Sequence, residues 1–396
     1  MSNSPSSPPA LSGNWNYPTT VRFGAGRIRE LPECCRSLGM ERPLLVTDPG
    51  LAKLPLVSDA LAVNTDTDLE TGLFADIKPN PVGKNISDGL RVFHEGGHDG
   101  VIAFGGGSAM DAGKTIAFMA GQKRPLWDFE DLGDNWKRAE TDAIAPVVAV
   151  PTTSGTGSEV GRATAVIDEE AETKKILFHP RMLPELVICD PQLVTGLPPA
   201  ITAATGMDAL AHCLEAFCVD VYHPMADGIA LEGIALIIHA LPAAVADGSD
   251  IDARGHMLVA AAMGGVAFQK DLGATHSLAH PLSAICGAHH GTANAICLPH
   301  VMRFNAQRKP GVYRRIGLAC GLDVVSCSDA EADELTIQFI DDFIQRCGMP
   351  PSLEDVGVEE QHIEALADQA WVDPCHQTNP VPVTREDLKE LFLKAL

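Results

Sequence analysis

The sequence predicts a two-part protein: an α/β domain with a Rossmann-like parallel sheet, followed by an all-α domain. Three observations support this. The 396-residue chain is long enough for two domains, its first half alternates short apolar runs with helical stretches, and the pattern becomes purely helical after about Thr195. We expect a flexible tail at 1–14, the α/β domain at 15–195 and the helical domain at 196–396.

Four apolar runs of five or six residues, each stopped by Gly, Pro or Asp, predict the strands. They are PLLVTD (43–48), GVIAF (100–104), PVVAV (146–150) and LVICD (186–190). Runs that are apolar at nearly every position are typical of strands buried on both faces of a parallel sheet. Helix-like segments such as ISDGLRVFHEGG (86–97) lie between them, as in βαβ units.

The second half carries long stretches with a 3.6-residue period. After the turn-rich TGLPP (195–199) come ALAHCLEAFCVDVY, DGIALEGIALIIHALPAAVA, ELTIQFIDDFIQRCG and REDLKELFLKAL. The most apolar of them begins near Ile229 and is interrupted by Glu232, His239 and Pro242. We therefore expect a buried helix here rather than a membrane span.

Composition narrows the possible partners. The net charge of −23 argues against nucleic acid and anionic membranes, because no basic patch offsets it. The N-terminal MSNSPSSPPALSGN lacks the charged and apolar regions of a signal peptide. The eleven cysteines are scattered and form no CxxC pair. They predict reduced thiols and a cytoplasmic protein.

FGGGSAMDAGK (104–114) follows a predicted strand and opens a predicted helix. Its glycines let the backbone approach a ligand, and a helix N-terminus attracts anions, so the stretch suits a pyrophosphate. Met110 stands where the third glycine of GxGxxG would be, and the Walker pattern does not fit either. A plain tight turn between strand and helix is the alternative.

A second loop, VPTTSGTGSEV (150–160), also follows a strand, so both loops should meet at the carboxyl edge of the sheet, where ligands of such sheets bind. Asp48 ends the first run and could accept hydrogen bonds from a ribose, which favours NAD over NADP. An acid that precedes the glycines departs from the usual fingerprint. A helix cap is an equal alternative for Asp48.

Histidines are concentrated in GATHSLAHPLSAICGAHHGTANA (273–295), which holds four of the chain's 14. Asp208 and His212 stand four residues apart on a predicted helix, His276 and His280 have the same spacing, and His290 follows. One carboxylate with several imidazoles suits Fe²⁺ or Zn²⁺. The alternative is a set of buried histidines that bond to backbone carbonyls.

Several of these blocks occur together and in a fixed order: GGGSAMDAGK, VPTTSGTGSE, TGMDALAH, H-x₃-HP, HHGTANA and LPHVMRFN. In this the chain resembles the iron-containing (group III) alcohol dehydrogenases of the dehydroquinate-synthase-like superfamily. The resemblance runs from about Phe23 to the C-terminus. It implies a dinucleotide-binding domain at 15–195, a metal-binding and catalytic domain at 196–396, and an active site between them.

The resemblance also implies roles for individual residues. The metal, Fe²⁺ or possibly Zn²⁺, would be held by Asp208, His212, His276 and His290, while His280 would move the proton near the nicotinamide. NAD would be bound by a larger set: Asp48, Asn80, Gly105, Gly106, Gly107, Ser108, Thr152, Thr153 and Lys174. The implied reaction is reversible hydride transfer between a primary alcohol and NAD⁺, in a homodimer or higher homo-oligomer that acts on small molecules.

Two departures from the family pattern concern the site. Many relatives have Pro-His-Gly at the last ligand, whereas this chain has Ala288-His289-His290-Gly291. We choose His290, which precedes the glycine and lies 14 residues after His276. The segment 267–276 is one residue shorter than in well-known members, which leaves the substrate open. A zinc-dependent polyol (glycerol-type) dehydrogenase and a metallohydrolase are the alternatives.

Overall fold

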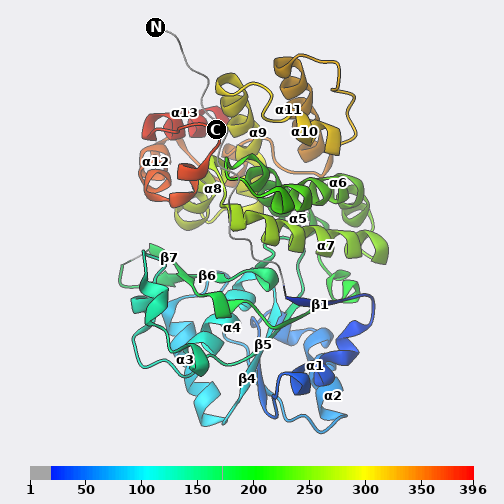
Figure 1. Cartoon of the computed structure of the whole chain (residues 1–396), viewed down its shortest axis with the longest axis vertical. Coiled ribbons are helices and arrows are strands. Elements are labelled where there is room, and N and C mark those ends of the chain that lie inside the picture. The colour runs from blue at the N-terminus through cyan, green and yellow to red at the C-terminus, as the bar shows by residue number, and fades with distance from the viewer. Residues whose placement is uncertain (1–18, 172) are drawn as a thin grey trace.

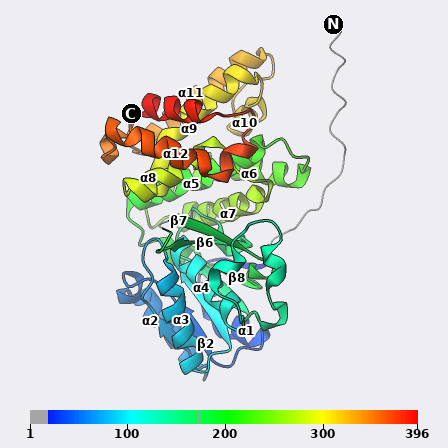
Figure 2. The same cartoon turned by 90° about the vertical axis from the view of Figure 1, so that its left-hand side faces the viewer.

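The computed structural model describes residues 19–171 and 173–396. The predicted tail at 1–14 lies outside these residues. The described chain has an α/β half that holds the early residues and a helical half that holds the later ones (Figures 1 and 2). The predicted fold class is therefore confirmed.

A six-stranded parallel sheet forms the centre of the α/β half, in the order β1-β8-β5-β4-β2-β3. Its strands are β1 (Thr20–Phe23), β2 (Pro43–Val46), β3 (Gly72–Phe74), β4 (Gly100–Gly105), β5 (Val147–Pro151) and β8 (Leu186–Cys189). The four predicted apolar runs are the four inner strands, so these predictions are confirmed. The two edge strands were not predicted, because β1 and β3 are short and partly exposed.

Alternate residues of each inner strand face opposite sides of the sheet, and helices cover both sides. Leu44 and Val46 of β2 pack with residues of α3 (Gly83–Glu95) and α4 (Gly107–Met119). Leu45 points the other way, into a core shared with α1 (Leu31–Ser37) and α2 (Pro55–Thr65). This double cover explains why the inner strands are apolar at every position.

A two-stranded antiparallel hairpin of β6 (Ala163–Asp168) and β7 (Thr173–Phe178) stands apart from the main sheet. It lies between the sheet and the helical half (Figures 1 and 2). The hairpin was not predicted, because its strands are only partly buried and differ from the fully buried apolar runs by which the inner strands were identified. It carries Lys174, one of the predicted nucleotide-binding residues.

Nine α-helices make up the rest of the chain. They are α5 (Pro199–Cys218), α6 (Pro224–Ala246), α7 (Ile251–Ala267), α8 (Ala274–Ile285), α9 (His290–Arg308), α10 (Arg314–Ala319), α11 (Asp329–Arg346), α12 (Ile363–Val372) and α13 (Arg385–Ala395). One apolar core joins α5, α6, α7 and α11 with one side of α9, and a second joins α8, α12 and α13 with the other side. Because α9 belongs to both cores, it holds α8 next to α5.

Helix α6 is the one helix of the described residues that is long and apolar enough to cross a membrane, with a mean hydropathy of 2.0 over its best window. It packs against α5 and α7 in the helical half. Ala230, Ile234, Ile237 and Leu241 are buried there, while Glu232 and His239 face outward. This arrangement matches the prediction of a helix in a protein core.

Candidate active site

The structure brings four predicted ligands together around one carboxylate oxygen. Oδ1 of Asp208 lies 3.4 Å from Nε2 of His290 and 3.7 Å from Nε2 of both His212 and His276. The rings of His212 and His276 are stacked, with centroids 4.7 Å apart. Asp208, His212 and His276 are buried, and His290 is half-buried. Three imidazole nitrogens therefore lie within 3.7 Å of one carboxylate oxygen, and donor atoms of Asp208, His276 and His290 lie within 4.8 Å of one another.

Three helices supply the cluster, and their close approach depends on a glycine. Asp208 and His212 come from one face of α5, His276 from α8, and His290 from the first position of α9. A Cβ added to Gly291 would lie 1.9 Å from the carbonyl oxygen of Ala204 on α5 and 3.4 Å from Cβ of Asp208. No side chain fits between the two helices there. Gly291 thus lets α9 approach α5 closely enough for His290 to reach Asp208.

Glu215, which was not predicted, fixes the orientation of His276. Its Oε2 lies 2.6 Å from Nδ1 of His276, and its Oε1 accepts a hydrogen bond from the backbone N–H of Thr275 at 2.7 Å. Glu215 stands seven residues after Asp208, on the same face of α5. With Nδ1 bonded to a carboxylate, Nε2 of His276 is left to face Asp208.

Asn294 of α9 is a further buried neighbour of the cluster. Its Nδ2 donates a hydrogen bond to Oδ1 of Asp208 at 2.9 Å and lies 3.3 Å from Nε2 of both His276 and His290. It stands four residues after His290, so both side chains lie on one face of the helix. Asn294 therefore binds the same carboxylate oxygen of Asp208 that faces the three imidazoles.

The electrostatics of the cluster differ from residue to residue. Burial lowers the pKa of His212 to about 4 and holds that of His290 well below its usual value. Burial also opposes protonation of His276, but Asp208 and Glu215 outweigh it and raise its pKa to about 9. For Asp208, the three imidazoles outweigh burial and hold the pKa well below its usual range.

This donor set fits a divalent transition metal. Ligands that share one ion at ~2.0–2.2 Å lie roughly 3–3.5 Å from one another, close to the 3.4–3.7 Å between Oδ1 of Asp208 and the three imidazole nitrogens. Imidazole and carboxylate together suit Fe²⁺ and Zn²⁺. The carboxylate of Glu215 behind His276 is also a usual feature of metal-binding histidines.

His280 lies beside the cluster, and its second partner was not predicted. Its ring is stacked on that of His290 with centroids 5.3 Å apart, and its side chain is 28% exposed, so it contacts both the cluster and solvent. Nδ1 of His280 lies 2.7 Å from Oδ2 of Asp373, which precedes the 3₁₀ helix Pro374–Thr378. Although burial opposes it, the bonds from His280 and Ser277 hold the pKa of Asp373 well below its usual range.

The two glycine-containing loops meet at the carboxyl edge of the sheet, as predicted. The backbone N–H of Thr152 donates to the carbonyl of Gly105 at 2.9 Å. A Cβ on Gly106 would lie 3.2 Å from Cγ2 of Thr153, and one on Gly107 would lie 2.7 Å from Cγ2 of Thr156. The first N–H groups of α4 open onto this edge, because the helix begins at Gly107.

The same edge touches the metal-binding helix. A Cβ on Gly155 would lie 2.9 Å from Cβ of Thr205, which is one turn before Asp208 on α5. Gly157 and Gly265 of α7 approach still more closely, since a Cβ on either would lie within 2.6 Å of the other residue's backbone. The loop at 150–160 is thus packed directly against α5, which carries Asp208 and His212, and against α7.

The other predicted nucleotide residues have varied surroundings. Oδ1 of Asp48 accepts backbone hydrogen bonds from Gly50 and Leu51 at 2.8 and 2.9 Å, which is the helix-cap alternative. The hydroxyl of Ser108 donates to the carbonyl of Pro79, next to the exposed Asn80. Lys174 on β7 is close enough to His290 to lower its pKa. The positive charge of the exposed Lys174 therefore acts on His290 from the α/β half.

Lys270, in the segment before His276, binds residues of α5 and α6 rather than the cluster. Nζ of the buried Lys270 lies 2.5 Å from Oδ1 of Asp227 on α6 and bonds the carbonyl of Phe217 at 3.4 Å. Asp271 next to it adopts a left-handed backbone with φ of 76°. Lys270 therefore ties the segment to α6 rather than offering a charge to a substrate.

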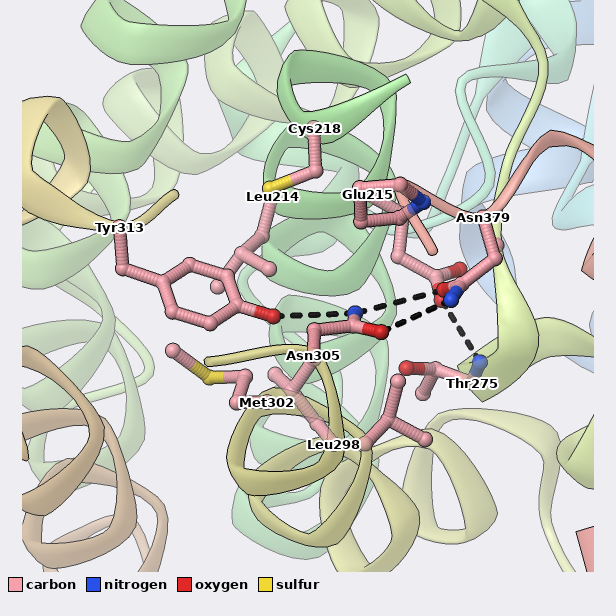
Figure 3. Close-up of a pocket in the computed structure, with 12 residues that line it drawn as sticks. Leu214, Glu215, Cys218, Thr275, Leu298, Met302, Asn305, Tyr313 and Asn379 are labelled. Carbon is pink, nitrogen blue, oxygen red and sulfur yellow. Dashed lines mark hydrogen bonds between the residues drawn. The ribbon is translucent and has the colours of Figure 1, made fainter. Parts of the chain in front are cut away.

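A small cavity lies next to Glu215 (Figure 3). Its walls include a chain of hydrogen bonds in which Asn305 donates to the hydroxyl of Tyr313 at 3.1 Å and Asn379 donates to Asn305 at 2.8 Å. The free volume is about 10 Å³, which is room for one water molecule at most. The cavity is therefore too small for a substrate. The hydrogen-bonded side chains in its walls pack against Glu215.

Comparison with known proteins gives the family. Residues 18–191 match the family described as iron-containing alcohol dehydrogenase, and residues 202–396 match the C-terminal part of the Fe-containing alcohol dehydrogenase family. The chain belongs to the iron-containing alcohol dehydrogenase family. It is thus an oxidoreductase of a family that uses Fe²⁺ and NAD(H), and the hydrolase and glycerol-type alternatives are not supported.

Individual members of this family are similar over nearly their whole length. A 4-hydroxybutyrate dehydrogenase of Cupriavidus necator is 36% identical, covering 96% of this chain and 99% of the relative. A crystal structure of a 1,3-propanediol oxidoreductase is 35% identical with a TM-score of 0.92, covering 97% and 99%. A sulfoacetaldehyde reductase of Bifidobacterium kashiwanohense in complex with NAD⁺ is 28% identical with a TM-score of 0.87, covering 98% and 99%.

Proposed function

We propose that this iron-containing alcohol dehydrogenase interconverts a small primary alcohol and its aldehyde, with Asp208, His212, His276 and His290 as the metal ligands. The observation that carries the proposal is the convergence of three Nε2 atoms on Oδ1 of Asp208, beside the loop at 150–160. In this assignment 15–195 binds the dinucleotide, and 196–396 binds the metal and performs the chemistry.

A bound Fe²⁺ supplies a Lewis acid that polarises the oxygen of the substrate, and NAD⁺ supplies the hydride acceptor. The residues of the chain set the geometry for both. The bond from Glu215 to Nδ1 of His276 would leave Nε2 free to hold the ion, and Asn294 fixes the position of the Asp208 carboxylate by donating to its Oδ1. Burial of these side chains excludes water and strengthens every charge interaction in the site.

We assign proton transfer to His280. When an alcohol is oxidised, the hydroxyl proton must leave as the hydride moves to the nicotinamide. His280 is adjacent to His290, partly exposed, and bonded through Nδ1 to Asp373. That bond fixes the orientation of the ring, and an imidazole in contact with solvent can take up a proton and release it.

We assign the dinucleotide to the carboxyl edge of the sheet. The N–H groups at the start of α4 would hold the pyrophosphate with Gly105, Gly106, Gly107 and Ser108, since a helix N-terminus favours anions. The remaining residues assigned to the cofactor are Asp48, Asn80, Thr152 and Thr153, which follow strands of the main sheet, and Lys174 on the β6–β7 hairpin. The carboxylate of Asp48 favours NAD over NADP, because it would repel a 2′-phosphate.

The substrates of the relatives guide the choice of alcohols to test. The named compounds are 4-hydroxybutyrate, 1,3-propanediol and sulfoacetaldehyde, all short molecules with a second polar group. We propose a short primary alcohol for this chain too, in the cytoplasm and in a homo-oligomer of at least two copies. Exposed Val21 and Phe23 on the edge strand β1 support pairing with another copy.

The decisive experiment pairs metal analysis with a substrate scan. Protein purified without chelator should contain close to one iron per chain, and alcohols added with NAD⁺ should produce NADH absorbance at a rate well above that with NADP⁺. Light scattering measures the oligomer. Protein that holds iron and NAD but turns over none of a broad panel of short alcohols and aldehydes would contradict the proposal.

A further inference from the structure

A second group of metal-binding side chains lies next to the proposed iron site. One donor atom each of His280, Asp373 and Cys375 lies within 4.8 Å of the other two. They come from α8 and from the start of the 3₁₀ helix Pro374–Thr378, which are far apart in the sequence. The group combines nitrogen, oxygen and sulfur donors, whereas the iron cluster has no sulfur.

The local structure holds this group in place. Oδ1 of Asp373 accepts hydrogen bonds from the hydroxyl of Ser277 at 2.7 Å and from the backbone N–H of Cys375 at 2.9 Å, while Oδ2 lies 2.7 Å from Nδ1 of His280. The carboxylate is thus fixed at both oxygens. His280, Asp373 and Cys375 are each half-buried, so an ion from solvent can reach them.

We propose that His280, Asp373 and Cys375 form a second site, which binds a thiophilic divalent cation such as Zn²⁺ or Cd²⁺ and inhibits the enzyme. Imidazole, carboxylate and thiolate are the three ligand types that Zn²⁺ takes in proteins, and three protein ligands leave a fourth position for water. Ligands that share such an ion at ~2.0–2.3 Å lie roughly 3–4 Å apart. The ion can therefore replace the His280–Asp373 hydrogen bond with little movement.

The protons of Cys375 and His280 must move when the cation binds, and this explains why the cation inhibits the enzyme. Burial and the neighbouring Asp373 hold the pKa of the Cys375 thiol well above its usual value, so the thiol is protonated before an ion binds. When an ion binds, the thiol proton goes to solvent and the imidazole proton of His280 moves from Nδ1 to Nε2. One proton is released per ion. His280 is then held by the ion and can no longer pass a proton.

Inhibition by the cation rests on the proposed role of His280 in the reaction, whereas binding of the cation does not. The following experiment measures binding and inhibition separately. Cd²⁺ is titrated into the iron-loaded full-length enzyme while the ultraviolet thiolate-to-cadmium charge-transfer band, the turnover and the iron content are measured. We expect a band that saturates at one Cd²⁺ per chain, with turnover falling in parallel and iron retained. The same loss of turnover is expected with Zn²⁺.

The variants are Cys375→Ser and Cys375→Ala, with Cys327→Ser as a control at a half-buried thiol elsewhere. Loss of a residue that only hydrogen-bonds to a metal ligand lowers metal affinity by about 10–100-fold. Loss of the sulfur ligand itself should therefore remove the charge-transfer band and raise the Cd²⁺ concentration needed for inhibition at least about tenfold. Cys327→Ser should behave as the parent.

Three results would overturn the second site. They are a band of parental strength in both Cys375 variants, no band in the parent, and loss of iron in step with the loss of turnover. If the chain turned over none of the alcohols, the charge-transfer band would still report whether Cys375 binds the ion. Failure of the proposed function can thus be told from failure of this site.

Discussion

Nδ1 of His276 lies 2.6 Å from Oε2 of Glu215, and this contact directs the other ring nitrogen of His276 toward Asp208. The pair is buried in the helical half. A carboxylate in this position both selects the tautomer and makes the imidazole a stronger ligand. The charge of Glu215 therefore contributes to metal affinity, although Glu215 is not among the four proposed ligands.

Glu215→Gln keeps the size and removes the charge. We expect iron affinity to fall by about 10–100-fold, as measured by the iron retained during dialysis against a graded chelator. Glu232→Gln, at an exposed position on α6, is the matched control and should retain iron like the parent. Equal iron retention in the two variants would contradict this role for Glu215.

Substitution of His276 and substitution of His280 should have different effects on iron content and activity. His276→Ala should lose iron and activity together. His280→Ala should keep its iron while kcat falls by about 10²–10⁴-fold, the usual contribution of a general acid or base. Metal content and steady-state rates, measured on the same preparations, check both. An iron-free His280→Ala protein would show that the roles are assigned wrongly.

Gly291→Ala tests the contact between α9 and α5. The added Cβ would lie 1.9 Å from the carbonyl oxygen of Ala204, so α9 must move and carry His290 away from Asp208. We expect a loss of unfolding free energy of about 1–3 kcal/mol, together with loss of iron. Gly228→Ala on α6, where a Cβ meets nothing within 4 Å, should keep its iron and be no less stable than the parent.

Gly106→Ala tests the nucleotide edge. Its Cβ would lie 3.2 Å from Cγ2 of Thr153 and would narrow the space between the two loops. If one charge-assisted hydrogen bond to the pyrophosphate is lost, at about 1.5–3 kcal/mol, the KM for NAD⁺ should rise at least about tenfold with iron content unchanged. Gly196→Ala, with no neighbour within 4 Å of its Cβ, serves as the control.

Glu159 gives a prediction on pH. Burial raises its pKa to about 7, and its own backbone N–H and the nearby Lys114 only partly oppose this. Between pH 4.5 and 7 the folded protein holds a proton that the unfolded chain releases, so stability falls as pH rises through this window. Above pH 7 the full cost of the buried charge is present.

Glu159→Gln removes that cost. The variant should therefore gain thermal stability over the parent at pH 8, and the gain should shrink at pH 5. Melting temperatures at the two pH values check this, with Glu170→Gln at an exposed position as the control. A gain that is the same at both pH values would mean that the ionisation of Glu159 is not the cause.

The parts of the fold that could be predicted have strong local patterns in the sequence. The inner strands were apolar at every position because helices cover both faces of the sheet, and the long helices showed their period directly. Strand β3 and the β6–β7 hairpin had no such pattern, since they are short or half exposed. Their pairing depends on contacts that only the folded chain shows, such as the bridge from Val82 to Ile167.

The candidate site also contains residues that could be predicted from the sequence and residues that could not. Asp208, His212, His276 and His290 lie together as the spacing and the family resemblance suggested, and their ligand role stays a prediction. Glu215 could have been found, because it lies three residues after His212 on the same helix face. Asp373 could not, because 93 residues separate it from His280 and nothing near it in the sequence indicates the contact.

The contacts of Gly155 with Thr205 and of Gly157 with Gly265 have a mechanical consequence. At Gly157 and Gly265 main chain meets main chain, and at Gly155 the main chain lies against Cβ and the carbonyl of Thr205, so no long side chain separates the two halves there. Such contacts cannot yield by a change of rotamer. We therefore expect the two halves to keep their spacing along these contacts if they move relative to each other.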